Sequence, residues 1–211
     1  MTNPARVILW RHGRTQWNLE LRWQGQSDIE MDEVGRGQAD EAAAVLVGLA
    51  PTKIVSSPLL RAQDTAGRLA SRAGLAVLLD DRLMETNGGQ WEGMTQSEIR
   101  QSHSADLHRW FTDSEAKAGV TGESRVEIAS RFAAAVRHHS EDGGTVVFVT
   151  HGGIVRAGLL ELLDLPLDRV GVFKVLNNCG WAVLDRDEAT GHFRVNDYNR
   201  TAGEPLPEHH L

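Results

Sequence analysis

Segments typical of buried strands alternate with segments typical of amphipathic helices along most of the 211-residue chain. The strand-like runs are short and apolar, and they cover residues 6–10, 53–56, 75–79 and 145–150. Apolar residues recur at helical spacing over residues 35–49, 57–73 and 124–136, and in the segment before Pro166. A helix between two strands makes those strands parallel and covers a face of the sheet. The pattern therefore predicts an α/β fold, a three-layer α/β/α sandwich with a mostly parallel central sheet.

Several short motifs predict where helices begin. Ser57 followed by Pro58 is typical of an N-cap with proline at the first helical position. The segments 95–98 and 124–127 both fit a capping box. Residues 84–93 hold three glycines, so we expect a loop there. Residues 181–185 and 192–196 predict a closing pair of strands.

We expect one domain over residues 1–200, because no repeat, low-complexity segment or linker divides the sequence. The polar, proline-containing residues 201–211 are expected to form a disordered tail. A chain of this length buries roughly 70% of the surface that its unfolded form exposes, so the core needs no disulfide or metal.

Charge and cysteine content limit the partners and the location. The net charge of −7 argues against sequence-independent binding to nucleic acid, which depends on Lys and Arg neutralising phosphates. The first apolar run is too short for the core of a signal peptide, and no apolar stretch approaches a membrane span. Cys179 is the single cysteine, so an intrachain disulfide is impossible. We therefore expect a cytoplasmic protein without a nucleic-acid or membrane partner.

Cationic and reactive side chains follow three of the predicted strands directly. Arg11 and His12 come after the first strand, Arg61 lies in the first turn of the helix after the second, and His151 follows the run 145–150. In parallel sheets, ligands collect beyond the carboxyl ends of the strands. Arginine forks and helix N-termini suit phosphate oxygens. The sequence therefore predicts a site for a phosphate-sized dianion.

The candidate residues have complementary chemistry for phosphoryl transfer. An unprotonated ring nitrogen of His12 can attack phosphorus and form a phosphohistidine. Glu85, from the glycine-rich loop, can supply a proton to the leaving alkoxide if partial burial or neighbouring negative charge keeps it neutral. A cationic His151 can stabilise charge on the phosphoryl oxygens.

Six ordered segments resemble the motifs of the histidine phosphatase superfamily, which has the phosphoglycerate mutase-like fold. The run 9–18 resembles its signature, and further matches occur at residues 25–28, 56–62, 83–93, 122–124 and 151–153. The resemblance implies that His12 accepts the phosphoryl group and that Glu85 donates the proton. It also implies that Arg11, Arg61 and His151 bind the phosphoryl group. It places Asn18, Gln24, Gly25 and the N–H of Gly152 near the substrate, and it implies catalysis without a metal or other cofactor.

Some residues keep a second interpretation. Glu92 competes with Glu85 for the acid role, but we expect Glu92 to support the helix entry at Thr95. Arg14, Arg22 and Arg156 either line the mouth of the site or form surface salt bridges. Where the family more often has Leu followed by Ser or Thr, this chain has Met31 and Asp32, which puts only a helix entry in doubt. His138-His139 and His209-His210 lack a third ligand, so we expect no metal site.

The same chemistry serves a phosphatase, when water attacks the phosphohistidine, or a mutase, when phosphoglycerate attacks it. Dimeric mutases of the family carry a long basic insertion after the catalytic glutamate. Residues 95–122 hold Arg100, Arg109 and Lys117 but no matching basic block. We therefore predict a metal-independent phosphomonoesterase acting on small phosphorylated metabolites of the sugar phosphate or phosphoglycerate type, and a homodimer is possible. The alternatives are a 2,3-bisphosphoglycerate-dependent phosphoglycerate mutase and a non-catalytic phospho-ligand-binding protein.

Overall fold

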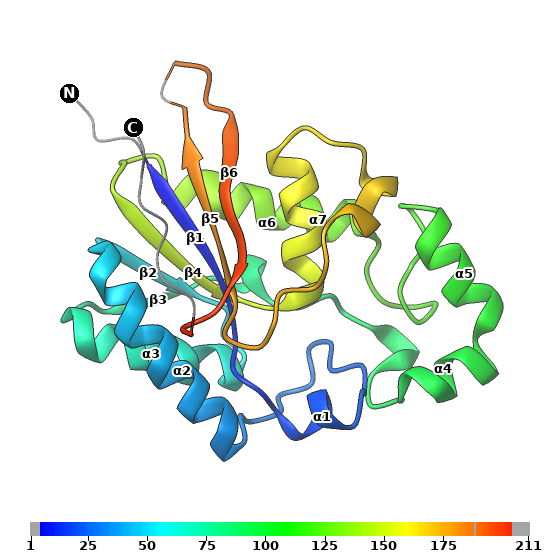
Figure 1. Cartoon of the computed structure of the whole chain (residues 1–211). Helices are drawn as coiled ribbons and strands as arrows, with labels where there is room; N and C mark the ends of the chain where they lie inside the picture. Colours follow the sequence, from blue (N-terminus) through cyan, green and yellow to red (C-terminus); the bar gives the residue numbers. More distant parts are fainter. Residues whose placement is uncertain (1–4, 188, 204–211) are drawn as a thin grey trace.

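The computed structural model describes residues 5–187 and 189–203. Its sheet has six strands in the order β3-β2-β4-β1-β5-β6 (Figure 1). These are β1 (Arg6–Arg11), β2 (Lys53–Ser56), β3 (Val77–Leu79), β4 (Thr145–Thr150), β5 (Trp181–Arg186) and β6 (Phe193–Arg200). The first four are mutually parallel, whereas β5 runs antiparallel to β1 and β6 antiparallel to β5. The predicted mostly parallel sheet is confirmed, with an antiparallel pair at one edge.

Helices cover both faces of the sheet. The helices are α1 (Gln16–Leu19), α2 (Glu33–Leu46), α3 (Leu60–Ala73), α4 (Gln96–Ser102), α5 (Ser104–Thr112), α6 (Arg125–His139) and α7 (Gly152–Leu162). Alternate residues of β1 point to opposite faces: Ile8 and Trp10 join the core beneath α2 and α3, and Val7 and Leu9 join the core beneath α6 and α7. The predicted three-layer α/β/α arrangement is confirmed.

Helices α4 and α5 lie apart from these layers, beyond the end of the sheet (Figure 1). Short 3-10 helices occur at Val47–Leu49, Asp81–Leu83, Gly89–Trp91 and Leu167–Val172. The glycine-rich segment 84–93 is otherwise a loop, as predicted, and it connects the end of β3 with α4.

The predicted helix start at Ser57 is wrong. Helix α3 begins at Leu60, and the N–H of Leu60 donates to Oδ1 of Asp28 at 2.7 Å, so a distant loop caps the helix. The Ser57 hydroxyl accepts from the N–H of Leu59, before the helix begins, at 3.3 Å, and it also lies within 2.8 Å of Nε2 of His151. Sequence spacing alone did not reveal the distant carboxylate.

Other helix starts agree with their sequence signals. Both capping boxes are confirmed, at Thr95 and at Ser124. The departure from the family pattern at Met31-Asp32 leaves the helix entry intact, because Asp32 is the N-cap of α2 and accepts from the N–H of Gly35 at 2.7 Å. Helix α2 therefore covers Glu33–Leu46 rather than 35–49.

Two sequence expectations concern the ends of the chain and membranes. Most of the expected tail, residues 204–211, lies outside the described residues. Among the described helices, none combines the length and apolarity needed to cross a membrane.

Candidate active site

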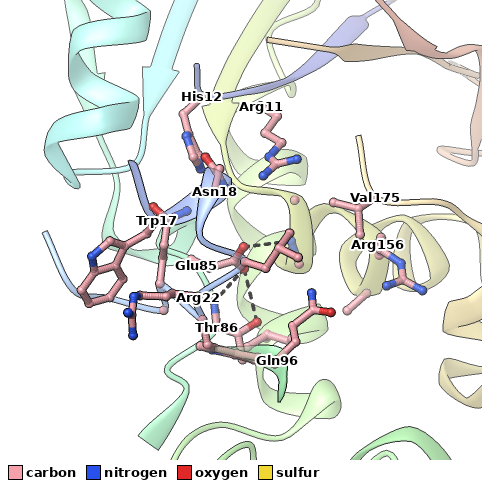
Figure 2. Close-up of a pocket in the computed structure, with 18 of the residues that line it drawn as sticks. Arg11, His12, Trp17, Asn18, Arg22, Glu85, Thr86, Gln96, Arg156 and Val175 are labelled. Carbon is pink, nitrogen blue, oxygen red and sulfur yellow. Dashed lines mark hydrogen bonds between the residues drawn. The ribbon is translucent and has the colours of Figure 1, made fainter. Parts of the chain in front are cut away.

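A cavity of about 500 Å³ opens at the carboxyl ends of the parallel strands. It is lined by eight of the predicted site residues: Arg11, His12, Asn18, Gln24, Gly25, Arg61, Glu85 and Gly152. The ninth, His151, lies immediately behind this wall, with its ring centroid 5.1 Å from that of His12. Residues from β1, α3, α7 and the loop after β3 therefore meet at one place, as Figure 2 shows for those it labels.

His12 is held as a neutral ring with a defined tautomer. Its Nδ1–H donates to the carbonyl of Gly13 at 2.7 Å, so the lone pair is on Nε2. The side chain is only 3% exposed. Burial lowers the pKa of His12 well below its usual value, and the charges of Arg61 and Arg11 lower it further. The ring is therefore neutral near neutral pH with a free lone pair on Nε2, which is the form a nucleophile needs.

Arg61 is a buried cation held by the protein at several points. Its Nη2 donates to the carbonyl of Gly25 at 2.7 Å, its Nη1 to the carbonyl of Ser27 at 2.8 Å, and its Nε to Nδ1 of His151 at 3.2 Å. Burial lowers the pKa of Arg61 to about 10, so the guanidinium stays charged at neutral pH.

Arg11 keeps donor capacity for a ligand. Its Nη1 donates to the carbonyl of Leu176 at 2.5 Å, while its buried Nε has no hydrogen-bond partner among the described residues. Burial lowers the pKa of Arg11, and Glu85 opposes the shift. Arg11 and Arg61 thus bring two guanidinium groups to the same cavity as His12.

His151 differs from the cationic group that the sequence suggested. Its Nδ1 accepts from Arg61, so the neutral ring carries its proton on Nε2 and donates it to the Ser57 hydroxyl at 2.8 Å. Burial lowers the pKa of His151 well below its usual value, and Arg61 lowers it further. A neutral His151 orients Arg61 and Ser57, and the cationic charge of the site belongs to the arginines.

Glu85 lies at the N-terminus of α7 (Figure 2). Its carboxylate accepts from the N–H groups of Gly153 at 2.9 Å, Ile154 at 2.8 Å and Thr86 at 2.8 Å. A Cβ at position 153 would lie 2.7 Å from Oε1 of Glu85, so a larger residue there would displace this carboxyl group. None of these contacts to Glu85 comes from a negatively charged group of the kind that the sequence suggested for keeping it neutral. Backbone donors and a helix dipole hold the carboxyl group instead.

Sequence reasoning missed Arg131, which fixes the segment carrying Glu85. From α6, Arg131 donates to the carbonyls of Met84 at 2.7 Å and Glu85 at 3.1 Å, and it forms an ion pair with Glu123 at 2.8 Å. Glu123 also accepts from the N–H of Asn87 at 2.8 Å. Arg131 occupies an ordinary polar position of an amphipathic helix, so nothing in the sequence distinguished it.

Glu92 has a structural role, as expected, but it supports the loop around Gly25 rather than the helix entry at Thr95. Its carboxylate accepts from the N–H groups of Gln26 at 2.9 Å, Ser27 at 3.1 Å and Gly88 at 3.0 Å. It therefore organises the loop that carries Gly25, whereas the α4 entry at Thr95 is capped by its own box.

Asn18 is also oriented by its neighbours. Its Oδ1 accepts from the N–H of Thr15 at 3.0 Å and from Nδ2 of Asn178 at 3.1 Å. The Thr15 hydroxyl donates to Oε1 of Gln24 at 3.0 Å. With its carbonyl oxygen occupied, Asn18 has its Nδ2 donors available to the cavity that it lines.

The three ambiguous arginines divide between the two interpretations. Arg14 forms an ion pair with Asp32 at 2.8 Å. Arg22 lines the cavity and is also paired with Glu20 at 2.5 Å. Arg156 lines the cavity (Figure 2) and has no ion pair with a carboxylate in the described part of the chain. In residues 5–187 and 189–203, no group of three or more His, Cys, Asp or Glu side chains could hold a metal ion.

A family model described as the histidine phosphatase superfamily (branch 1) matches residues 7–201. The chain belongs to the histidine phosphatase superfamily. Together with its relatives, this makes it a phosphoric monoester hydrolase. The family and the phosphatase class predicted from the sequence are confirmed.

Among curated proteins, the chain is 40% identical to a glucosyl-3-phosphoglycerate phosphatase of Mycobacterium tuberculosis, over 93% of this chain and 95% of the relative. A solved mycobacterial glucosyl-3-phosphoglycerate phosphatase in complex with VO3 matches with a TM-score of 0.86 and 36% identity, over 93% of this chain and all of that one. A phosphoserine phosphatase of Entamoeba histolytica in complex with 3-phosphoglyceric acid matches with a TM-score of 0.83 and 30% identity, over 93% and 98% of the two chains. These similarities favour a phosphatase over a phosphomutase.

Proposed function

We propose that the protein hydrolyses a phosphomonoester through a phosphohistidine on Nε2 of His12. The Nδ1–H bond from His12 to the carbonyl of Gly13 carries this proposal, because it leaves the Nε2 lone pair free. Nε2 attacks phosphorus, a P–N bond forms and the P–O bond to the leaving alcohol breaks. Arg11 and Arg61 balance the charge on the phosphoryl oxygens.

Glu85 completes the proton balance in this proposal. In its protonated form it gives a proton to the leaving oxygen in the first step. The resulting carboxylate then takes a proton from the water that attacks phosphorus, while the P–N bond breaks and inorganic phosphate forms. The hydrogen bonds from the α7 N-terminus keep Glu85 in place through both steps.

We propose glucosyl-3-phosphoglycerate as the substrate, with other phosphoglycerates and sugar phosphates as weaker ones. The similarity to glucosyl-3-phosphoglycerate phosphatases over nearly the full length of both chains supports this choice. A panel of phosphorylated metabolites assayed with excess EDTA tests it. Hydrolysis of glucosyl-3-phosphoglycerate should persist without metal and should have the highest kcat/KM of the panel. Strict dependence on Mg²⁺ would contradict the mechanism.

The nucleophile is tested by His12→Ala. This variant should lose turnover by about 10⁴-fold or more and should form no acid-labile phosphoenzyme. Glu85→Gln should still trap phosphate on His12 with an activated ester such as p-nitrophenyl phosphate, because that leaving group needs no proton. Wild-type activity in His12→Ala would exclude His12 as the nucleophile. Measuring 3-phosphoglycerate isomerisation alongside phosphate release separates hydrolysis from mutase activity.

We further propose a cytoplasmic homodimer without a nucleic-acid partner. The single cysteine supports the location, because Cys179 is buried and forms no disulfide. The edge strand β3 supports the dimer, since its Leu78 and Leu79 are 45% and 54% exposed. Light scattering in solution measures the dimer directly.

A further inference from the structure

The cavity contains a second pair of arginines that the phosphoryl chemistry does not use. Arg125 is the first residue of α6 and Arg156 lies in the middle of α7, and both line the same cavity as His12 and Glu85. The two positive charges influence each other. Burial lowers the pKa of Arg125, Asp113 opposes that shift, and the charge of Arg156 adds to it.

The hydrogen bonds that this pair makes within the protein are incomplete. Arg125 is 2% exposed; its Nη1 donates to the carbonyl of Trp110, but its Nε and Nη2 are buried without a partner among the described residues. Arg156 donates from Nη2 to the carbonyl of Val170 at 2.7 Å, and its buried Nε has no partner within the same residues. Neither arginine forms an ion pair with a carboxylate of the described chain. Buried donors are normally paired, so these free N–H groups need an explanation.

The fold gains little from a positive charge at position 125. A cation at a helix N-terminus faces the positive end of the helix dipole, and Arg125 occupies that position in α6. Its guanidinium carbon lies over the Trp110 ring, 5.4 Å from the ring centroid, and Nε and Nη2 still have no hydrogen-bond partner among the described residues. An apolar side chain would pack on Trp110 without burying a charge.

We propose that Arg125 and Arg156 bind a second anionic group, a carboxylate, on the alcohol portion of the substrate. The inference rests on the proposed phosphatase function and specifies its substrate class as carboxylate-bearing phosphomonoesters. Guanidinium forks match the two oxygens of a carboxylate, and their free N–H groups supply the donors. Arg156 lies in α7 two residues after Ile154, whose N–H donates to Glu85, so the two arginines and the proposed proton donor line neighbouring parts of one cavity. The second anion therefore binds near the leaving oxygen, as in a 3-phosphoglycerate, where two carbon atoms separate the carboxylate carbon from the ester oxygen.

A matched pair of substrates tests this subsite. 3-Phosphoglycerate and glycerol 3-phosphate share a carbon chain and a phosphate, and only the first carries a carboxylate. The wild-type protein should prefer 3-phosphoglycerate, and Arg125→Met and Arg156→Met should each lower the ratio of the two kcat/KM values by about tenfold, or about 1.4 kcal/mol. The loss should appear mainly in KM, because the carboxylate does not change during the reaction and is bound equally in the ground state and the transition state. Arg100→Met, at an exposed position of α4 outside the cavity, is the control and should keep the wild-type ratio.

Three results separate the possible failures. Equal losses for both substrates, or no preference in the wild-type protein, would overturn the subsite. If the wild-type protein prefers 3-phosphoglycerate to glycerol 3-phosphate but does not hydrolyse glucosyl-3-phosphoglycerate, only the proposed substrate is rejected. If no ester is hydrolysed, calorimetric binding of the same two compounds to wild type and Arg125→Met still measures the subsite, and equal affinities would overturn it.

The variant Arg125→Lys keeps the charge and should retain part of the preference for 3-phosphoglycerate, whereas Arg125→Met should not. Thermal melts confirm that each variant is folded.

Discussion

At the scale of single residues, the site keeps two neutral histidines beside two charged arginines. His12 and His151 are buried, and burial together with the arginine charges lowers the pKa of each. The arrangement suits a nucleophile, because His12 needs no deprotonation step near neutral pH. It also makes the folded state sensitive to acid.

The first prediction concerns this sensitivity. An unfolded histidine titrates near 6.5. Since the folded pKa values are lower, the unfolded chain binds more protons below that pH, and the free energy of unfolding falls as the pH drops below it. Between its folded and unfolded pKa values, each histidine contributes a slope of at most about 1.4 kcal/mol per pH unit. Urea denaturation between about pH 7.5 and about pH 5.5 should therefore show a smaller slope in His12→Asn than in wild type. The exposed His108→Asn is the control, and an equal slope in His12→Asn would contradict the prediction.

Glu92 gives a second prediction at this scale. It touches no reacting atom, but its carboxylate holds the loop whose Gly25 carbonyl accepts from Arg61. Glu92→Gln places an amide donor against backbone and hydroxyl donors, so the loop should shift. Displacement of Arg61 should lower kcat/KM by about 10-fold to 100-fold. Steady-state kinetics measure this, with Glu30→Gln at an exposed position as the control. Full activity in Glu92→Gln would show that the loop does not position Arg61.

The identity of the residues in the site was largely predictable from the sequence, but the charge state of His151 was not. His12, Arg11, Arg61 and Glu85 follow strands or lie in the loop after one, and strand ends gather at one edge of a parallel sheet. The neutral form of His151 was not predictable, because it depends on the hydrogen bond from Arg61, 90 residues away in sequence.

At the scale of secondary-structure elements, the contact between α6 and α7 depends on one glycine. A Cβ at Gly158 would lie 2.0 Å from Cδ1 of Phe132, which is fully buried. Phe132 projects from α6 into the space that the missing side chain leaves on α7. The two helices therefore pack as closely as this glycine allows.

The third prediction compares two helical glycines. Gly158→Ala should lower the free energy of unfolding by about 1–3 kcal/mol, because the helices must separate or Phe132 must leave its rotamer. Gly67→Ala, in α3, meets nothing within 4 Å and should raise it by about 0.5–1 kcal/mol through helix propensity. Chemical denaturation of both variants measures the difference. Equal effects would show that α6 and α7 tolerate the extra methyl group.

Elements were predictable where their signals were local. The capping boxes at Thr95 and Ser124 depend on residues three positions apart, and both are present. The start of α3 depends instead on Asp28, and the path of the chain through α4 and α5 depends on packing around Trp110. A single sequence does not show such distant partners.

At the scale of the whole molecule, a chain of net charge −7 binds an anion. Arg11, Arg61, Arg125 and Arg156 form a positive cavity within an acidic surface. The long-range field opposes the approach of substrate, and the short-range hydrogen bonds hold it.

The fourth prediction follows from these opposing effects. Added salt screens the repulsion from the acidic surface as well as the attraction to the cavity, and buried contacts are screened least. We expect kcat/KM to change by less than about threefold between about 50 and 300 mM NaCl. Kinetics with an uncharged viscosity-matched cosolvent provide the control. A loss of tenfold or more would show that long-range attraction governs binding.

The end of β4 also bears on how the molecule loses activity. The carbonyls of its last two residues accept from the N–H groups of Ser57 and His12, and the Thr150 hydroxyl donates to the carbonyl of Leu83, just before Glu85. These bonds join the segments that carry His12, Arg61 and Glu85 to β4, one of the two central strands of the sheet. The amide hydrogens of His12 and Ser57 should exchange with solvent only when the whole sheet opens. The amide hydrogens of α4 and α5, which lie outside the layers, should exchange earlier. Inactivation and global unfolding are then one cooperative event, and partial opening of the molecule exposes the substrate cavity without dismantling its chemistry.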